Sequence, residues 1–171
     1  MTRAQAGTGS EMDDQEIMEC LLDNDGSTRD INFTPAAFEN VSLLISLLID
    51  DYQQGVFFGP GGEQVEFESK AVCSLLGKEA GTIYGYFESE TALIKKLQLF
   101  LDWPEEGQCA VELSFFSDDL QADFKIERFL SQLNSWWDIL KAREVFVRYE
   151  NASWEWYNPN DLGVFYHQTR A

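Results

Sequence analysis

A wide apolar stripe between residues 35 and 54 is the feature that most constrains the fold. Thr34 is a residue type favoured at a helix N-cap, and Pro35 is favoured at the first helical position. Gly55 lies where a glycine often ends a helix. Between them, apolar side chains recur every three or four residues, at Phe38, Val41, Leu44, Ile45, Leu48, Ile49 and Tyr52. The sequence therefore predicts a helix over 35–54, and its broad stripe favours packing against a sheet.

Turn residues and alternating apolar residues predict the first strands of that sheet. Asp23-Asn24-Asp25-Gly26 separates two short apolar runs, and these residue types tolerate the positive φ of a tight turn. We therefore expect a hairpin with strands over 16–22 and 27–33. Alternation predicts further strands over 56–58, 64–69 and 82–88, with one helical turn near 72–76.

Residues 92–117 fit two interpretations. Leu93, Leu97 and Phe100 have helical spacing, which leaves a helix over 92–101 open. Apolar residues also alternate on both sides of the turn Pro104-Glu105-Glu106-Gly107, which favours a hairpin of 93–103 with 108–117. We choose the hairpin as the prediction.

A second amphipathic helix and a final set of strands complete the expected elements. The acidic stretch 118–123 would cap the helix, and its apolar stripe consists of Ile126, Phe129, Leu130, Leu133, Trp137 and Leu140. Residues 145–149 alternate as a strand, 154–157 would return as its partner, and a short apolar end follows at 164–166.

These elements predict an α+β fold with a mainly antiparallel sheet and two long amphipathic helices. The order hairpin, helix, strand occurs twice, so the chain is compatible with two ββαβ halves that share one sheet. We expect residues 1–14 to form a flexible polar tail and residues 15–171 to form one domain.

Strong acidity limits the partners of the chain. Thirty acidic residues against twelve basic ones give a net charge of −18 and a pI near 4.2. Such a field repels nucleic-acid phosphates and anionic lipid, and it attracts a basic protein. Acidity that serves only solubility is the alternative. Cys20, Cys73 and Cys109 are too widely spaced for a metal motif and indicate reduced thiols in the cytoplasm. Because residues 1–12 contain no apolar stretch and no apolar run approaches about 20 residues, we expect neither a signal peptide nor a membrane span.

No catalytic, cofactor or metal motif is indicated, because the candidate residues lack the spacing or the neighbours that such motifs require. The run Asp23–Gly26 does not place ligands at the positions that a calcium loop requires. His167 is the single histidine, which we expect at the surface or on a sheet edge. Gly59-Pro60-Gly61-Gly62 is followed by Glu63 and a strand, so a phosphate cradle is not indicated. We therefore expect no cofactor and no metal site.

Two separate stretches resemble an uncharacterised bacterial protein family. The first is Gly26-Ser27-Thr28-Arg29-Asp30-Ile31, which a long amphipathic helix follows, and the second is the strand 145–149 leading into Glu150-Asn151. The resemblance implies a hairpin strand over the first stretch and a bacterial cytosolic setting. It implies no activity.

The function that these features favour is non-enzymatic binding of a basic protein. Small, acidic, aromatic-rich cytosolic proteins include the bacterial immunity proteins and antitoxins that neutralise cationic toxins, because an acidic inhibitor can imitate the phosphates that the toxin holds. The alternatives are an enzyme that uses carboxylates and an oligomeric accessory protein. We expect the partner to be bound by exposed acids and two aromatic anchors, namely Asp50, Asp51, Glu66, Glu68, Glu105, Glu106, Trp136 and Tyr157.

Overall fold

The computed structural model describes residues 12–150, 154 and 163–170. In this described part, eight strands form one sheet in the order β3-β2-β4-β5-β6-β1-β7-β8, and every pairing among them is antiparallel. The strands are β1 (Thr28–Ala37), β2 (Gly55–Phe58), β3 (Gln64–Val65), β4 (Gly81–Glu88), β5 (Lys96–Glu105), β6 (Gln108–Phe116), β7 (Glu144–Tyr149) and β8 (Val164–Thr169). The expected α+β class with a mainly antiparallel sheet is confirmed.

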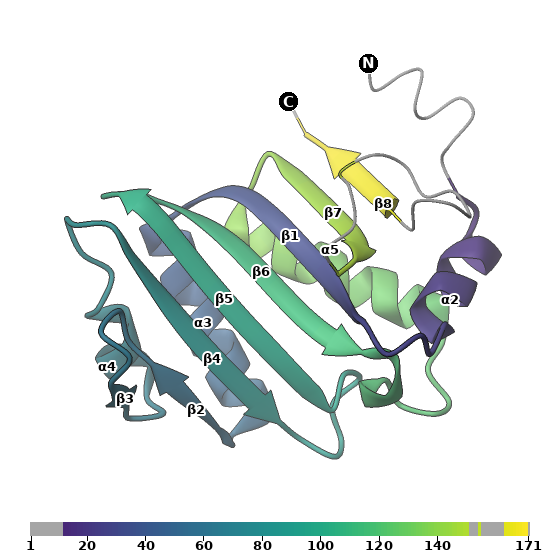
Figure 1. The fold of residues 1–171 in the computed structure, drawn as a ribbon, viewed down its shortest axis with the longest axis horizontal. Coiled ribbons are helices and arrows are strands. Elements are labelled where there is room, and N and C mark those ends of the chain that lie inside the picture. The colour runs from purple at the N-terminus through teal and green to yellow at the C-terminus, as the bar shows by residue number, and fades with distance from the viewer. Residues whose placement is uncertain (1–11, 151–153, 155–162, 171) are drawn as a thin grey trace.

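The two long helices cover one face of this sheet. α3 (Phe38–Tyr52) and α5 (Ile126–Leu140) lie side by side behind the strands, and the opposite face is turned toward the viewer in Figure 1. Inward side chains of alternate strand residues meet the helix stripes in one core, which includes Ile31, Phe33, Leu99, Leu113 and Val147. Burial of these side chains holds the layers together, at about 1.5–3 kcal/mol for each large one.

Shorter helices fill the margins of the sheet. α2 (Asp14–Leu22) packs beside the start of β1 and against α5, while α4 (Ser69–Cys73) lies against α3. A short 3₁₀ turn, η1 (Ser117–Asp119), links β6 to the loop before α5. None of the helices in the described ranges is long and apolar enough to cross a membrane.

Several sequence-based elements are confirmed with small changes of boundary. The hairpin β5–β6 replaces the alternative helix over 92–101, and α5, β4 and β7 form where the patterns predicted them. The strand expected over 64–69 is reduced to Gln64–Val65, and the helical turn expected over 72–76 begins earlier, as α4. Helix α3 starts at Phe38, three residues later than expected, because β1 continues through Thr34 and Pro35. It ends at Tyr52, where Gln53 takes the left-handed conformation and Gly55 already begins β2.

The hairpin predicted over 16–33 was wrong in its first half. Residues 14–22 form the helix α2, whose N-terminus has a capping box between Asp13 and Glu16. Ile17, Cys20 and Leu21 bury one side of this helix. Because the described residues before β1 form a helix where a strand was expected, this part of the chain is not a ββαβ unit, and the hypothesis of two such halves fails. Of the residues expected in the tail, Asp14 is the first residue of α2 and Asp13 is its N-cap, and residues 1–11 lie outside the described part.

Candidate functional site

The sheet face away from α3 and α5 carries a continuous row of side chains across seven strands. Residues directly opposite each other in antiparallel strands point to the same side, so the register defines this row. It runs through Phe58, Tyr84, Phe100, Glu112, Asn32, Phe146 and His167. We call this side of the sheet the open face (Figure 1). A second row beside it consists of Tyr86, Gln98, Ser114, Asp30 and Arg148.

Two carboxylates meet at one hydroxyl in the middle of the open face. Ser114 Oγ lies 2.7 Å from Asp30 Oδ1 and 3.1 Å from Glu112 Oε1. A serine hydroxyl carries one proton, so it cannot give both carboxylates a full hydrogen bond at once. Thr28 Oγ1 donates a second hydrogen bond to Asp30 Oδ1 at 2.9 Å, and Asn32 Nδ2 donates to Glu112 Oε2 at 3.0 Å. The site is therefore rich in acceptors and poor in donors.

A third carboxylate and one guanidinium border this pair. Glu150 Oε2 accepts from the backbone N–H of Thr28 at 3.1 Å. Arg148 points its Nε to Asn32 Oδ1 at 3.3 Å, and its guanidinium carbon lies 4.0 Å from the centre of the Trp154 ring. Within the described residues, none of the carboxylates of Asp30, Glu112 and Glu150 forms an ion pair. Their negative charge is balanced only in part by the one neighbouring arginine.

A cavity opens among these groups. Its volume is about 430 Å³, and Phe100 and Phe116 line it together with the polar side chains. Asp30 lines the cavity although only 4% of its surface is exposed. The remaining lining residues are Thr28, Gln98, Glu112, Ser114, Arg148 and Glu150.

Exposed aromatic side chains gather around the cavity. Phe100, Phe116 and Trp154 are 40%, 44% and 53% exposed, and they are the large aromatic hydrophobics of the described residues with such exposure. The ring of Phe100 contacts Tyr84 at 5.2 Å between centroids, and Trp154 contacts Phe146 at 5.3 Å. Solvent-exposed aromatic rings around a partly desolvated polar centre are typical of protein-binding surfaces.

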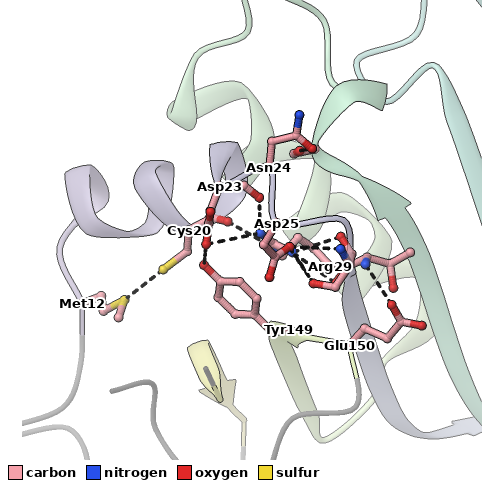
Figure 2. A network of polar contacts seen from close by, with 11 residues as sticks. Met12, Cys20, Asp23, Asn24, Asp25, Arg29, Tyr149 and Glu150 are labelled. Atoms are coloured by element: carbon pink, nitrogen blue, oxygen red, sulfur yellow. Dashed lines mark hydrogen bonds and ion pairs between the residues drawn. The ribbon is translucent and has the colours of Figure 1, made fainter. Parts of the chain in front are cut away.

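A buried arginine fixes the edge of the open face. Arg29 on β1 points to the helix side, where its Nε donates to Cys20 O at 2.8 Å and its Nη1 to Asp25 Oδ1 at 3.3 Å (Figure 2). The guanidinium also donates to the carbonyl oxygen of Asp23 and lies over the Tyr149 ring, 3.8 Å from its centre. These contacts join α2, the following turn, β1 and β7, so Thr28 and Asp30 have a rigid support.

The six acids predicted as partner contacts are exposed but do not form one surface. Glu105 and Glu106 lie at the β5–β6 turn, where Gly107 O accepts from the N–H of Phe38 at the start of α3. Asp50 and Asp51 lie at the opposite end of that 15-residue helix, about 20 Å away. Burial, and then the neighbouring Asp50, raise the pKa of Asp51. Glu66 and Glu68 precede α4, whose Ser69 hydroxyl contacts Ser46 on α3.

The two aromatic anchors have different outcomes. The prediction that Trp136 is exposed was wrong. Trp136 lies on the inner side of α5, and only 2% of its surface is exposed. Tyr157 lies outside the described residues. We expected His167 either at the surface or on a sheet edge, and it lies on the edge strand β8. Its side chain is buried against Phe146, and the two ring centroids are 4.1 Å apart. Cys20, Cys73 and Cys109 are free thiols, and Cys20 and Cys109 are buried whereas Cys73 is only partly buried.

Sequence reasoning missed Asp30, Ser114, Glu112 and Arg148 as a group. One signal was present: Asp30 and Glu150 lie in the two stretches that carry the family resemblance, and those stretches are neighbours in space. β1 pairs with β7, and Glu150 contacts Thr28 through both backbone and side chain. The first stretch nevertheless forms a strand after a helix, and not the strand of a hairpin.

The fold and its open face define an α+β protein with one antiparallel sheet that is covered by helices on a single side. No protein-family model and no curated protein sequence matches the chain. The fold is similar to a chain in the crystal structure of the toxic C-terminal tip of CdiA from Pseudomonas aeruginosa in complex with immune protein. The two chains are 14% identical, with a TM-score of 0.56, over 84% of this chain and 96% of the other. At this identity the likeness shows the fold alone.

Proposed function

We propose that this protein is a non-enzymatic binding protein of the toxin-immunity type, and that its partner is a basic protein. The observation that carries the proposal is the open face, where the exposed rings of Phe100 and Phe116 line a cavity with carboxylates that form no ion pair within the described residues. The exposed ring of Trp154 stacks on Arg148 at the border of this cavity. Such a surface offers anchors to a protein and negative charge to a cationic one.

Two further observations support the same function. The net charge of −18 gives a field that accelerates the encounter with a basic protein and suppresses binding of anions. The similar chain comes from a complex between a toxin tip and an immune protein, so this fold occurs in an assembly of that kind.

Capture from a lysate of the organism that encodes the chain tests this function. The bait is the wild-type protein, and it is compared with Phe100→Ala/Phe116→Ala, which removes two exposed rings from the open face. Leu22→Ala/Leu43→Ala is the matched control, because both leucines are exposed on helices away from that face. We expect a basic protein to be retained in equal amount by the wild type and the control, and to be lost from the open-face variant.

The captured protein is then produced alone and together with this chain in a bacterial host. We expect growth arrest with the captured protein alone and growth with the pair. Equal retention by all three baits, or a captured protein whose effect on growth this chain does not change, contradicts the proposed function.

A further inference from the structure

The cavity of the open face is lined by three carboxylates and one arginine, so its lining carries more negative than positive charge. Asp30 Oδ1 accepts two hydrogen bonds, whereas Oδ2 accepts none from the side chains of the described residues and remains accessible from the cavity that Asp30 lines. A buried carboxylate is costly unless it is paired or fully hydrogen-bonded. The nearby Glu112 shares its Ser114 donor with Asp30. An external cation with several N–H donors would satisfy both carboxylates.

The charges that line the cavity favour a cation despite the presence of one arginine. Asp30, Glu112 and Glu150 oppose Arg148 alone, so the lining has an excess of negative charge. Arg148 is turned toward Asn32, the Tyr149 carbonyl oxygen and the Trp154 ring. A metal ion is not indicated, because no three His, Cys, Asp or Glu side chains of the described residues are placed to hold one.

We propose that this cavity receives an arginine side chain of the basic partner. A planar guanidinium has five N–H donors, can bridge two carboxylates and stacks on aromatic rings. Asp30 and Glu112 supply the acceptors, while Phe100 and Phe116 line the cavity beside them. The volume of about 430 Å³ leaves room for the guanidinium and part of its aliphatic stem. This inference rests on the proposed function and names the contact within it.

A peptide titration tests the cavity without the native partner. The probes are a short arginine-rich peptide and a lysine peptide of the same length, with affinity measured by calorimetry at low salt. The cavity variant is Asp30→Asn/Glu112→Gln, which keeps the shape of both side chains. The control is Glu105→Gln/Glu106→Gln, which removes the same charge at the exposed β5–β6 turn. We expect the cavity variant to lose about tenfold or more in affinity for the arginine peptide. The control should lose about threefold or less.

A second variant separates a loss of binding from misfolding caused by the substitution of Asp30. Glu112 is half-buried, so Glu112→Gln alone should leave the thermal unfolding midpoint near that of the wild type and still weaken arginine binding. Amide chemical shifts of the wild type should change at Asp30, Ser114 and Glu112 on addition of the arginine peptide. Equal losses in the cavity and control variants, or no loss in either, would overturn the proposal.

The two proposals can fail separately. If the captured partner binds Asp30→Asn/Glu112→Gln as tightly as the wild type, the cavity does not receive its side chain, while the proposed function stands. If no partner depends on the open face but the arginine peptide still depends on Asp30 and Glu112, the cavity binds a guanidinium and the proposed function is wrong.

Discussion

Arg29 shows how one residue can decide the local fold. Its side chain is fully buried, yet its charge is met by Asp25 at 3.3 Å, by carbonyl oxygens of the preceding turn and by the Tyr149 ring. The Tyr149 hydroxyl in turn donates to Asp23 Oδ2 at 2.9 Å. Burial, and then this hydrogen bond, raise the pKa of Tyr149, so the ring stays neutral and keeps its donor. The turn that sequence patterns assigned to a hairpin is thus held by an arginine on the next strand.

Replacing this arginine should be severe. Arg29→Met keeps an unbranched side chain but removes every donor, which leaves the carbonyl oxygens of Asp23 and Cys20 without this partner. We expect the free energy of unfolding to fall by about 3–5 kcal/mol in denaturant titrations. Arg143→Met is the control, because Arg143 is exposed, and it should change stability by about 0.5 kcal/mol or less. Similar effects of the two substitutions would contradict the role of the Arg29 network.

The three thiols should differ in reactivity. Burial raises the pKa of Cys20 to about 11 and that of Cys109 to about 12, so neither forms much thiolate near neutral pH. Cys73 is less buried, on the short helix α4. With iodoacetamide at about pH 8, we expect mass spectrometry to find Cys73 modified first. All three should react alike in denaturant, and rapid modification of Cys20 or Cys109 in the native protein would contradict the prediction.

At the scale of elements, glycines mark where backbones meet closely. A Cβ atom on Gly55 would lie 2.1 Å from the backbone oxygen of Tyr86 on the neighbouring strand β4 and 2.6 Å from the Phe67 ring. Gly55→Ala must therefore move β2 away from β4, and we expect a loss of about 1–3 kcal/mol in the free energy of unfolding. Gly77→Ala should change it by about 0.5 kcal/mol or less, because its Cβ would meet only the Leu75 oxygen at 3.7 Å. Equal stability of the two variants in thermal melts would refute the expected clash.

Elements with a long, regular pattern could be predicted from the sequence, and those decided by distant contacts could not. The stripe of α5 and the alternation of β5 and β6 are local signals, and each formed as expected. Residues 16–22 contain Ile17, Cys20 and Leu21 at helical spacing, but the Asp-Asn-Asp-Gly turn beside them favoured a hairpin. Thr34 and Pro35 have the chemistry of a helix start, yet β1 continues through them, with Thr34 paired to Glu144 on β7 and a shift of the register with β6 between Phe33 and Ala36. The pairing partners of β1 lie more than seventy residues away, beyond any local pattern.

The candidate site was hidden for the same reason. Asp30, Ser114 and Arg148 are aligned only because β6, β1 and β7 are adjacent in the sheet. Trp136 illustrates the converse error: its position beside the helix stripe indicated exposure, but the wide contact of α5 with α3 and the sheet buries it. An apolar stripe identified from the sequence of one helix does not show the neighbouring elements, and these elements can bury residues beside the stripe.

On the scale of the whole molecule, the net charge and the cavity of the open face act on different steps of binding. A net charge of −18 acts at long range, and salt screens it within about 8–10 Å near physiological ionic strength. The cavity acts only after contact, where a bound partner would cover the nearly buried Asp30 and its charge would be little screened by salt. We therefore expect the distributed charge to set the association rate. We expect the carboxylates of the cavity to set the dissociation rate.

Kinetics with the captured basic partner separate these roles. The association rate of the wild type should fall by about tenfold or more from low to physiological salt, because steering fields are screened. Glu105→Gln/Glu106→Gln should lower the association rate at low salt and leave dissociation unchanged, since these side chains are exposed and distant from the cavity. Asp30→Asn/Glu112→Gln should mainly accelerate dissociation, because it removes the contact made after docking. If the association rate is independent of salt, the acidity of this chain serves solubility and not recognition, and the affinity must come from the open face alone.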